Sequence, residues 1–123
     1  MKGKAETVVT EKNTAKAMGS GTLDVFATPA MVALMEEAAW KCVVPELEPG
    51  MGTVGTLMNV QHTSATPLSM HVTAECELTE VDNRRLVFTV KAFDEVGPIG
   101  SGIHERFIVK DEKFVAKANA KRG

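Results

Sequence analysis

The chain has 123 residues, of which 44% are hydrophobic and 24% charged, and its net charge is −2. This length and composition are typical of one globular domain, so we expect residues 1–123 to form a single domain. The charge provides no basic surface for nucleic acid. No apolar run reaches the ~18 residues that a membrane span needs. The first residues also lack the apolar core of a signal peptide, which predicts a cytoplasmic protein.

A short strand and a loop are the first predicted elements. Residues 5–10 contain the β-branched run typical of a strand. Residues 11–24 are polar and carry Gly19 and Gly21, which favours a loop.

The most apolar stretch, residues 28–44, predicts one helix. Thr28 followed by Pro29 is a start signal, because the threonine hydroxyl can cap free N–H groups and proline at the first helical position loses no hydrogen bond. Only three charged side chains follow, and one of them, Glu36, lies at the edge of the broad apolar arc. A helix this apolar must be covered by other structure.

After this helix the hydrophobic period changes from that of a helix to two. The pattern predicts four long strands, at residues 53–63, 71–81, 85–93 and 99–110. Asp82 and Asn83 predict a two-residue turn between the second and third of them. Residues 111–123 predict a short helix or a frayed end.

In the first of these four strands the even positions are expected to share the apolar face, namely Val54, Thr56, Met58, Val60 and His62. Short connections between strands require antiparallel pairing. A sheet with one apolar face must cover something, and the apolar helix is the only segment long enough. We therefore predict an α+β hot-dog fold, in which a long central helix is wrapped by a curved antiparallel β-sheet.

Three polar residues, Thr28, Glu36 and His62, occupy positions where a purely structural pattern has apolar side chains. Each has a structural alternative: Thr28 can be a helix cap, His62 a satisfied core histidine, and Glu36 a side chain that bends out to solvent. Together they supply a hydroxyl, a carboxylate and an imidazole, which suit activation of water or of a nucleophile against a carbonyl.

The last strand carries a second polar group, because Gly100, Gly102, His104 and Arg106 share one face. Its glycines favour either close approach by a ligand or a second chain, or a bulge or tight curvature of the sheet. His71 is expected at the surface. Cys42 and Cys76 fall at apolar positions, which predicts two reduced, buried thiols, and no spacing indicates a metal site.

The sequence resembles the fluoroacetyl-CoA thioesterase family, a branch of the hot-dog acyl-CoA thioesterases. The likeness runs from about Val25 to Phe114. It is carried by four segments in order: residues 25–29 with Leu34-Met-Glu36; Gly55-Thr56 leading to residues 62–67; Glu80 through Arg85-Leu86; and residues 99–106.

This resemblance implies hydrolysis of an acyl-CoA thioester to a carboxylic acid and free CoA. It implies a catalytic set of Thr28, Glu36 and His62, with Gly55 and Arg106 in the substrate site and a backbone N–H near Gly55 holding the thioester carbonyl. It also implies a homodimer with each site near the subunit interface, alone or paired into a tetramer. No metal and no cofactor are expected, since CoA is part of the substrate.

One segment departs from the family. The fluoroacetate-specific enzyme has a longer stretch before its helix, with phenylalanines that form a lid, whereas residues 16–24 are short here and have no aromatic residue. This difference favours a general thioesterase for short or medium acyl-CoA. Two other functions remain open: a non-catalytic hot-dog module that binds acyl-CoA as a ligand, and a hydratase or dehydratase.

Overall fold

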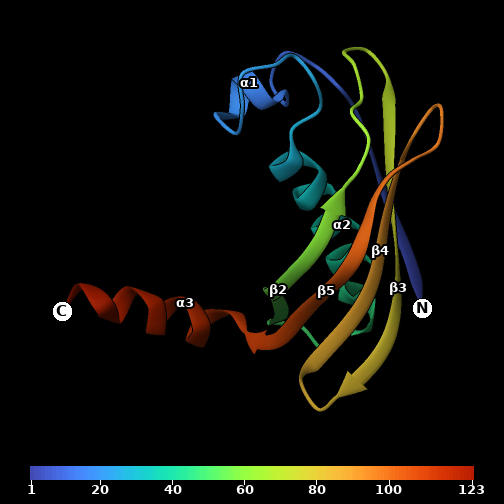
Figure 1. Ribbon diagram of the computed structural model, residues 1–123. Helices are drawn as coiled ribbons and strands as arrows, with labels where there is room; N and C mark the ends of the chain where they lie inside the picture. The colour runs from blue at the N-terminus through green and yellow to red at the C-terminus, as the bar shows by residue number, and fades with distance from the viewer.

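A computed structural model describes residues 1–123 as a curved five-stranded sheet whose concave face holds one long helix (Figure 1). All neighbouring strands are antiparallel, in the order β1-β3-β4-β5-β2. The strands are β1 (Lys2–Val8), β2 (Met51–His62), β3 (His71–Asp82), β4 (Arg85–Asp94) and β5 (Pro98–Lys110). The helices are α1 (Ala15–Met18), α2 (Thr28–Val43) and α3 (Asp111–Asn119), with short 3₁₀ turns at Val44–Glu46 and Ala120–Arg122.

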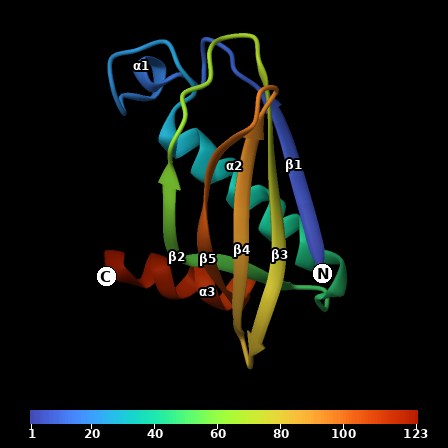
Figure 2. The same cartoon turned by 45° about the vertical axis from the view of Figure 1, so that its right-hand side comes forward.

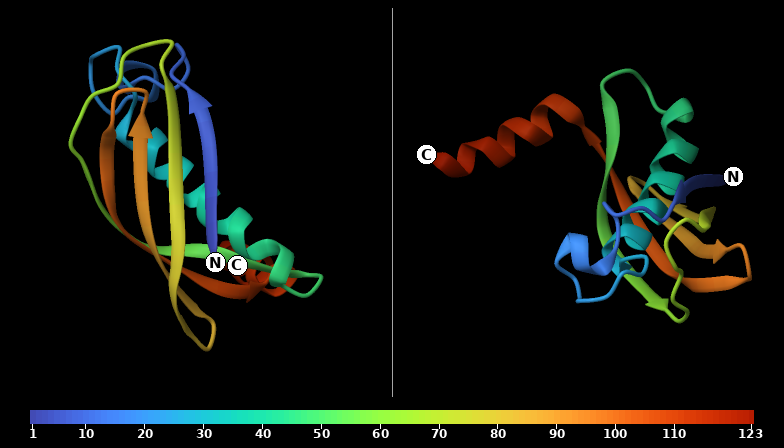
Figure 3. Two further views of the ribbon diagram at one scale, coloured as in Figure 1. Left: turned by 90° about the vertical axis from the view of Figure 1, so that its right-hand side faces the viewer. Right: turned by 90° about the horizontal axis from the view of Figure 1, so that it is seen from above.

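The predicted α+β hot-dog fold is confirmed, because α2 crosses the inner face of the sheet diagonally (Figures 2 and 3). Its buried side chains form most of one face of the core: Met31, Leu34, Met35, Ala38, Ala39 and Val43. The helix and the sheet come close together at Gly3 of β1, where a Cβ would lie 2.6 Å from the backbone oxygen of Ala38. Small side chains on α2 and this glycine therefore let the helix lie directly on the sheet.

Several predicted boundaries differ from the structure. The first strand covers Lys2–Val8 rather than residues 5–10, and the loop that follows contains the short helix α1. The turn between β3 and β4 lies one residue later than predicted, because Asp82 pairs with Arg85. Asn83 therefore occupies the first turn position, with a φ of 56° that asparagine tolerates better than most residues.

The largest error concerns the faces of β2. Its register against β5 shifts between Gly55 and Leu57, so Thr56 is an extra residue in a β-bulge. Beyond the bulge, Met58 and Val60 pack against the core, as their even numbers predict. Before it the inner positions are odd, which brings Thr53 and Gly55 to the inner face. The prediction that Val54 and Thr56 share the face of Met58 is wrong.

The glycines of β5 accommodate the chain's own neighbours. A Cβ at Gly102 would lie 2.1 Å from the backbone oxygen of Asn59, and one at Gly100 would lie 2.7 Å from the sulfur of Met31. Close packing of the chain on itself therefore gives these glycines a structural reason, and the register irregularity beside Gly100 is a bulge of the kind predicted. Approach by a ligand or a second chain stays a prediction.

The remaining expectations concern single side chains. His71 is exposed, as predicted. Both cysteines are free, but only Cys76 is buried and Cys42 is half-buried. Burial raises the pKa of Cys76 to about 12, so this thiol stays protonated and unreactive at neutral pH. None of the helices is both long and apolar enough to cross a membrane.

Candidate active site

Thr28 and His62 meet at the mouth of the fold. Thr28 is the first residue of α2 and His62 the last of β2, and the Thr28 Oγ1 lies 2.7 Å from the His62 Nδ1. The N-cap position belongs to Ala27, and no side chain caps this helix. The alternative in which Thr28 is a helix cap is therefore wrong, since its hydroxyl is directed to an imidazole instead.

The imidazole of His62 is half-buried, and its Nε2 has no hydrogen-bond partner within the chain. Burial lowers the pKa of His62 below its usual value of 6.5. The ring is therefore neutral at physiological pH, and one of its nitrogens can accept a proton. A hydroxyl bonded to a neutral imidazole is the arrangement that activates an attacking oxygen.

A hollow of about 290 Å³ adjoins this pair. Small side chains line it from three segments: Ala15 of α1, Ser20 of the following loop, and Ser64 and Ala65 after β2. Phe26 is the one aromatic residue in the lining, and it comes from the segment just before α2. The space beside the hydroxyl therefore suits a compact group.

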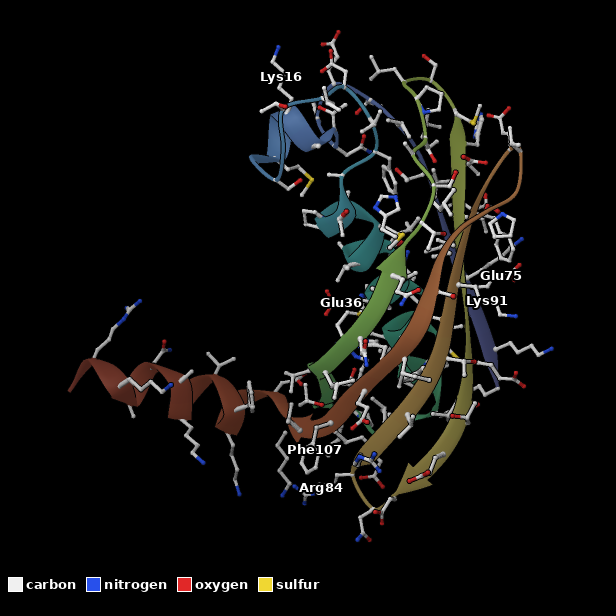
Figure 4. The ribbon with its side chains drawn as sticks, in the orientation of Figure 1. Lys16, Glu36, Glu75, Arg84, Lys91 and Phe107 are labelled. Atoms are coloured by element: carbon white, nitrogen blue, oxygen red, sulfur yellow. The ribbon has the colours of Figure 1, made fainter.

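Glu36 belongs to a second group of polar residues, further along α2 (Figure 4). Its Oε2 lies 3.6 Å from Nη1 of Arg106 on β5, and its side chain is 40% exposed. A Cβ on Gly55 would lie 2.8 Å from the same oxygen. The missing side chain of Gly55 thus makes room for the carboxylate.

Arg106 is held beneath Glu36 by three hydrogen bonds. Its Nε donates to the Thr53 Oγ1 at 2.8 Å, its Nη2 to the Thr53 carbonyl at 3.0 Å, and its Nη1 to the His104 Nε2 at 3.1 Å. The side chain is only 7% exposed, and burial lowers its pKa from the usual 12.5. An arginine nevertheless keeps its charge, so it provides a fixed cation facing the carboxylate.

The structure brings the five predicted site residues together in two groups rather than one. Thr28 and His62 form the first, and Glu36, Gly55 and Arg106 the second. Thr28 and Glu36 are eight residues apart on one helix, about 12 Å along its axis at 1.5 Å per residue. The sequence pattern identified the residues but not this separation.

The pattern also missed a residue. His104 was noted only as a neighbour of the β5 glycines, yet it is buried in contact with Arg106. The feature of the sequence that could have identified His104 is that it shares the inner face of β5 with Arg106, two residues away. No cluster of three or more His, Cys, Asp or Glu side chains gathers to hold a metal ion.

Comparison with known proteins places this geometry in a family. Residues 9–112 match the family of fluoroacetyl-CoA-specific thioesterases. The chain belongs to this family.

Individual relatives agree with that assignment. A fluoroacetyl-CoA thioesterase of Streptantibioticus cattleyicolor is 50% identical over 98 residues, which are 80% of this chain and 70% of that protein. A solved structure of the fluoroacetyl-CoA thioesterase FlK superposes with a TM-score of 0.94 at 41% identity, covering 98% of this chain and 94% of that one.

A more distant relative shares the fold. It is a thioesterase superfamily member of Thermus thermophilus, with a TM-score of 0.91, 29% identity, and coverage of 99% of this chain and 90% of that one. The resemblance seen in the sequence, the hot-dog fold and the class of thioester hydrolase are thereby confirmed.

Proposed function

We propose that this enzyme hydrolyses a short or medium acyl-CoA to the carboxylic acid and free CoA, with Thr28, Glu36 and His62 as catalytic residues. The observation that carries the proposal is the 2.7 Å contact between the Thr28 hydroxyl and the His62 imidazole, beside a hollow lined by small side chains. Relatives named for fluoroacetyl-CoA support the acyl-CoA class. The small hollow supports a short acyl group.

In the proposed mechanism, neutral His62 accepts the Thr28 proton as the Thr28 oxygen attacks the thioester carbonyl carbon. The carbon–sulfur bond then breaks, and the imidazolium gives its proton to the departing CoA sulfur. Water cleaves the resulting Thr28 ester to release the acid. Glu36 accepts the proton of that water, and the departing Thr28 oxygen takes up that proton, which restores the Thr28 hydroxyl and the Glu36 carboxylate.

Gly55 and Arg106 complete the proposed substrate site. The carbonyl oxygen becomes negative during attack and needs hydrogen-bond donors. A β-bulge leaves its extra residue outside the regular ladder, so backbone N–H groups near Gly55 are candidates for this role. Arg106 supplies a positive charge on the same side, next to Glu36.

A homodimer is part of the proposal, because two features of the chain call for a partner. β2 lies at the edge of the sheet and pairs only with β5, which leaves a twelve-residue strand edge open. In addition, the two groups of site residues lie about 12 Å apart along α2. A second copy against the β2 edge would place Glu36 of one protomer near Thr28 of the other.

The first experiment measures thiol release from a panel of acyl-CoAs, from acetyl to aryl, with Glu36→Ala beside the wild type. We expect release that depends on Glu36, fastest for the shortest chains. Tight acyl-CoA binding without any thiol release would instead support the alternative of a ligand-binding module. Loss of an enoyl-CoA double bond without thiol release would support a hydratase.

A subunit-complementation experiment tests the shared site. Thr28→Ala and Glu36→Ala proteins are each expected to be inactive, and are then mixed and allowed to exchange subunits. In a hybrid dimer with shared sites, one site has both mutations and the other has neither, so activity returns. Absence of any recovery, with subunit exchange verified by mass spectrometry, would place Thr28 and Glu36 of each site in one protomer.

A further inference from the structure

His104 is the most buried polar side chain of β5, at 1% exposure, and the proposed mechanism gives it no role. It lies on the inner face, where its ring stacks on Phe88 of β4 with centroids 6.1 Å apart. A buried imidazole needs hydrogen-bond partners for its ring nitrogens, and the choice of partners defines what the ring holds in place. His104 uses both of its ring nitrogens.

The two partners determine which ring nitrogen carries the proton. Arg106 Nη1 can only donate, so the His104 Nε2 at 3.1 Å must accept. The Leu57 carbonyl can only accept, so the His104 Nδ1 at 2.8 Å must donate. His104 is therefore neutral and protonated at Nδ1. A protonated ring would face the guanidinium with a second donor and a second positive charge.

These bonds connect three parts of the proposed site. Leu57 follows the extra residue of the β2 bulge, so its bond to His104 anchors the strand just beyond Gly55. Arg106 has its other two bonds to Thr53, on the opposite side of the bulge. With all three bonds made, the guanidinium plane is fixed and Nη1 is directed at Glu36, 3.6 Å away.

We propose that His104 is a positioning residue for Glu36, acting through Arg106. Its Nε2 holds the guanidinium in the orientation that faces the carboxylate, and its Nδ1–H holds the bulge that makes room for that carboxylate. This inference rests on the proposed catalytic role of Glu36. It adds a residue that touches neither substrate nor the reacting atoms.

The test compares two substitutions of similar size. His104→Gln retains one donor and one acceptor, whereas His104→Leu retains neither. We expect His104→Leu to lower kcat by about tenfold or more with KM within about twofold, because the misplaced carboxylate is needed in the transition state. His104→Gln should recover most of that loss. His71→Leu, at an exposed histidine, is the matched control and should leave kcat unchanged.

A double-mutant cycle separates positioning from general stability. If His104 acts through Glu36, adding His104→Leu to Glu36→Gln should cause almost no further loss of kcat. Losses that multiply in the double variant, or equal losses in His104→Gln and His104→Leu, would overturn the proposal. Thermal unfolding of each variant checks that the protein stays folded.

Nitrogen-15 NMR of the folded protein gives a readout independent of turnover. The His104 ring should show the Nδ1–H tautomer, and the Arg106 guanidinium signals should shift or broaden in His104→Leu. Unchanged Arg106 signals would overturn the positioning role whatever the activity. If Glu36→Gln keeps full turnover, the proposed role of Glu36 fails, and the NMR result alone decides whether His104 orients Arg106.

Discussion

The proposed active site depends on the absence of a side chain at Gly55. A Cβ there would lie 2.8 Å from the Glu36 Oε2 and 3.4 Å from the Arg106 Nη1, so either the carboxylate or the strand must move. We expect Gly55→Ala to lower kcat by about tenfold, because displacement of a catalytic group by even 1 Å is costly. Thiol release measures this effect.

The matched control for that substitution is Gly97→Ala. A Cβ at Gly97 has no atom within 4 Å, so the variant should keep wild-type turnover and stability. If Gly55→Ala were as active as Gly97→Ala, Glu36 would not need its observed position.

In the proposed mechanism, the pH dependence of activity follows from the protonation state of His62. Burial lowers the pKa of this imidazole below 6.5, and only the neutral ring can accept the Thr28 proton. We therefore expect kcat/KM to be constant above about pH 6.5 and to fall only at more acidic pH. A pH profile of kcat/KM measures the midpoint, and a midpoint above 6.5 would contradict the neutral, buried ring.

Stability should change with pH in the same direction. The pKa values of His62 and His104 are both lowered by burial, so between the folded and unfolded pKa the unfolded chain binds more protons. Their contribution to stability is complete above about pH 6.5 and is lost as the pH falls below it. Urea unfolding at a series of pH values checks this, with His71→Gln as an exposed control.

At the scale of elements, the contact between α2 and the sheet holds the site in place. Met31 is fully buried one turn after Thr28, and its sulfur fills the space above Gly100. We expect Met31→Ala to reduce the free energy of unfolding by about 2–5 kcal/mol, because a cavity remains in the core. Urea denaturation measures this change.

Met18 provides the comparison, since it ends α1 and is largely exposed. Met18→Ala should change the free energy of unfolding by less than about 0.5 kcal/mol. Equal effects at both positions would mean that α2 is not packed as the structure describes.

The elements also show where sequence patterns stop being informative. Period-two alternation located β2 to β5 within two residues at each end. This alternation could not reveal the bulge at Thr56. One extra residue moves every earlier side chain of the strand to the other face of the sheet, without changing the composition of the strand. Gly55 was identified as a site residue by resemblance, but its place on the inner face of the sheet depends on this bulge.

At the scale of the whole molecule, α3 lacks contacts that would stabilise it. It leaves the body at the end of β5 and extends past the edge strand β2, and all of its residues are exposed (Figures 1 and 2). Phe114 and Val115 are its large hydrophobic side chains, and they are 43% and 56% exposed. A helix of nine residues is too short to persist alone in water.

Since α3 projects past one end of the open β2 edge (Figure 1), we expect it to contribute to the proposed dimer. The double variant Phe114→Ser/Val115→Ser should dissociate at concentrations where the wild type remains dimeric, as measured by light scattering over a dilution series. Lys113→Ser is the control, because Lys113 lies about 160° around the helix from Val115 at 3.6 residues per turn. An unaffected dimer would remove α3 from the interface, and a monomeric wild type would contradict the dimer itself.

The sequence by itself determined the central helix, the four long strands and their antiparallel pairing, and it indicated Thr28, Glu36 and His62 as candidate site residues. These follow from local periodicity and from polar residues at apolar positions, which are properties of neighbours in the chain. The tertiary structure alone decided that Thr28 bonds to His62 and not to its own helix, that Glu36 faces Arg106, and that His104 bonds to Arg106. Thr28 and His62 are 34 positions apart, and His104 and its second partner Leu57 are 47 positions apart. Contacts of this kind depend on strand register, which hydrophobic periodicity does not encode.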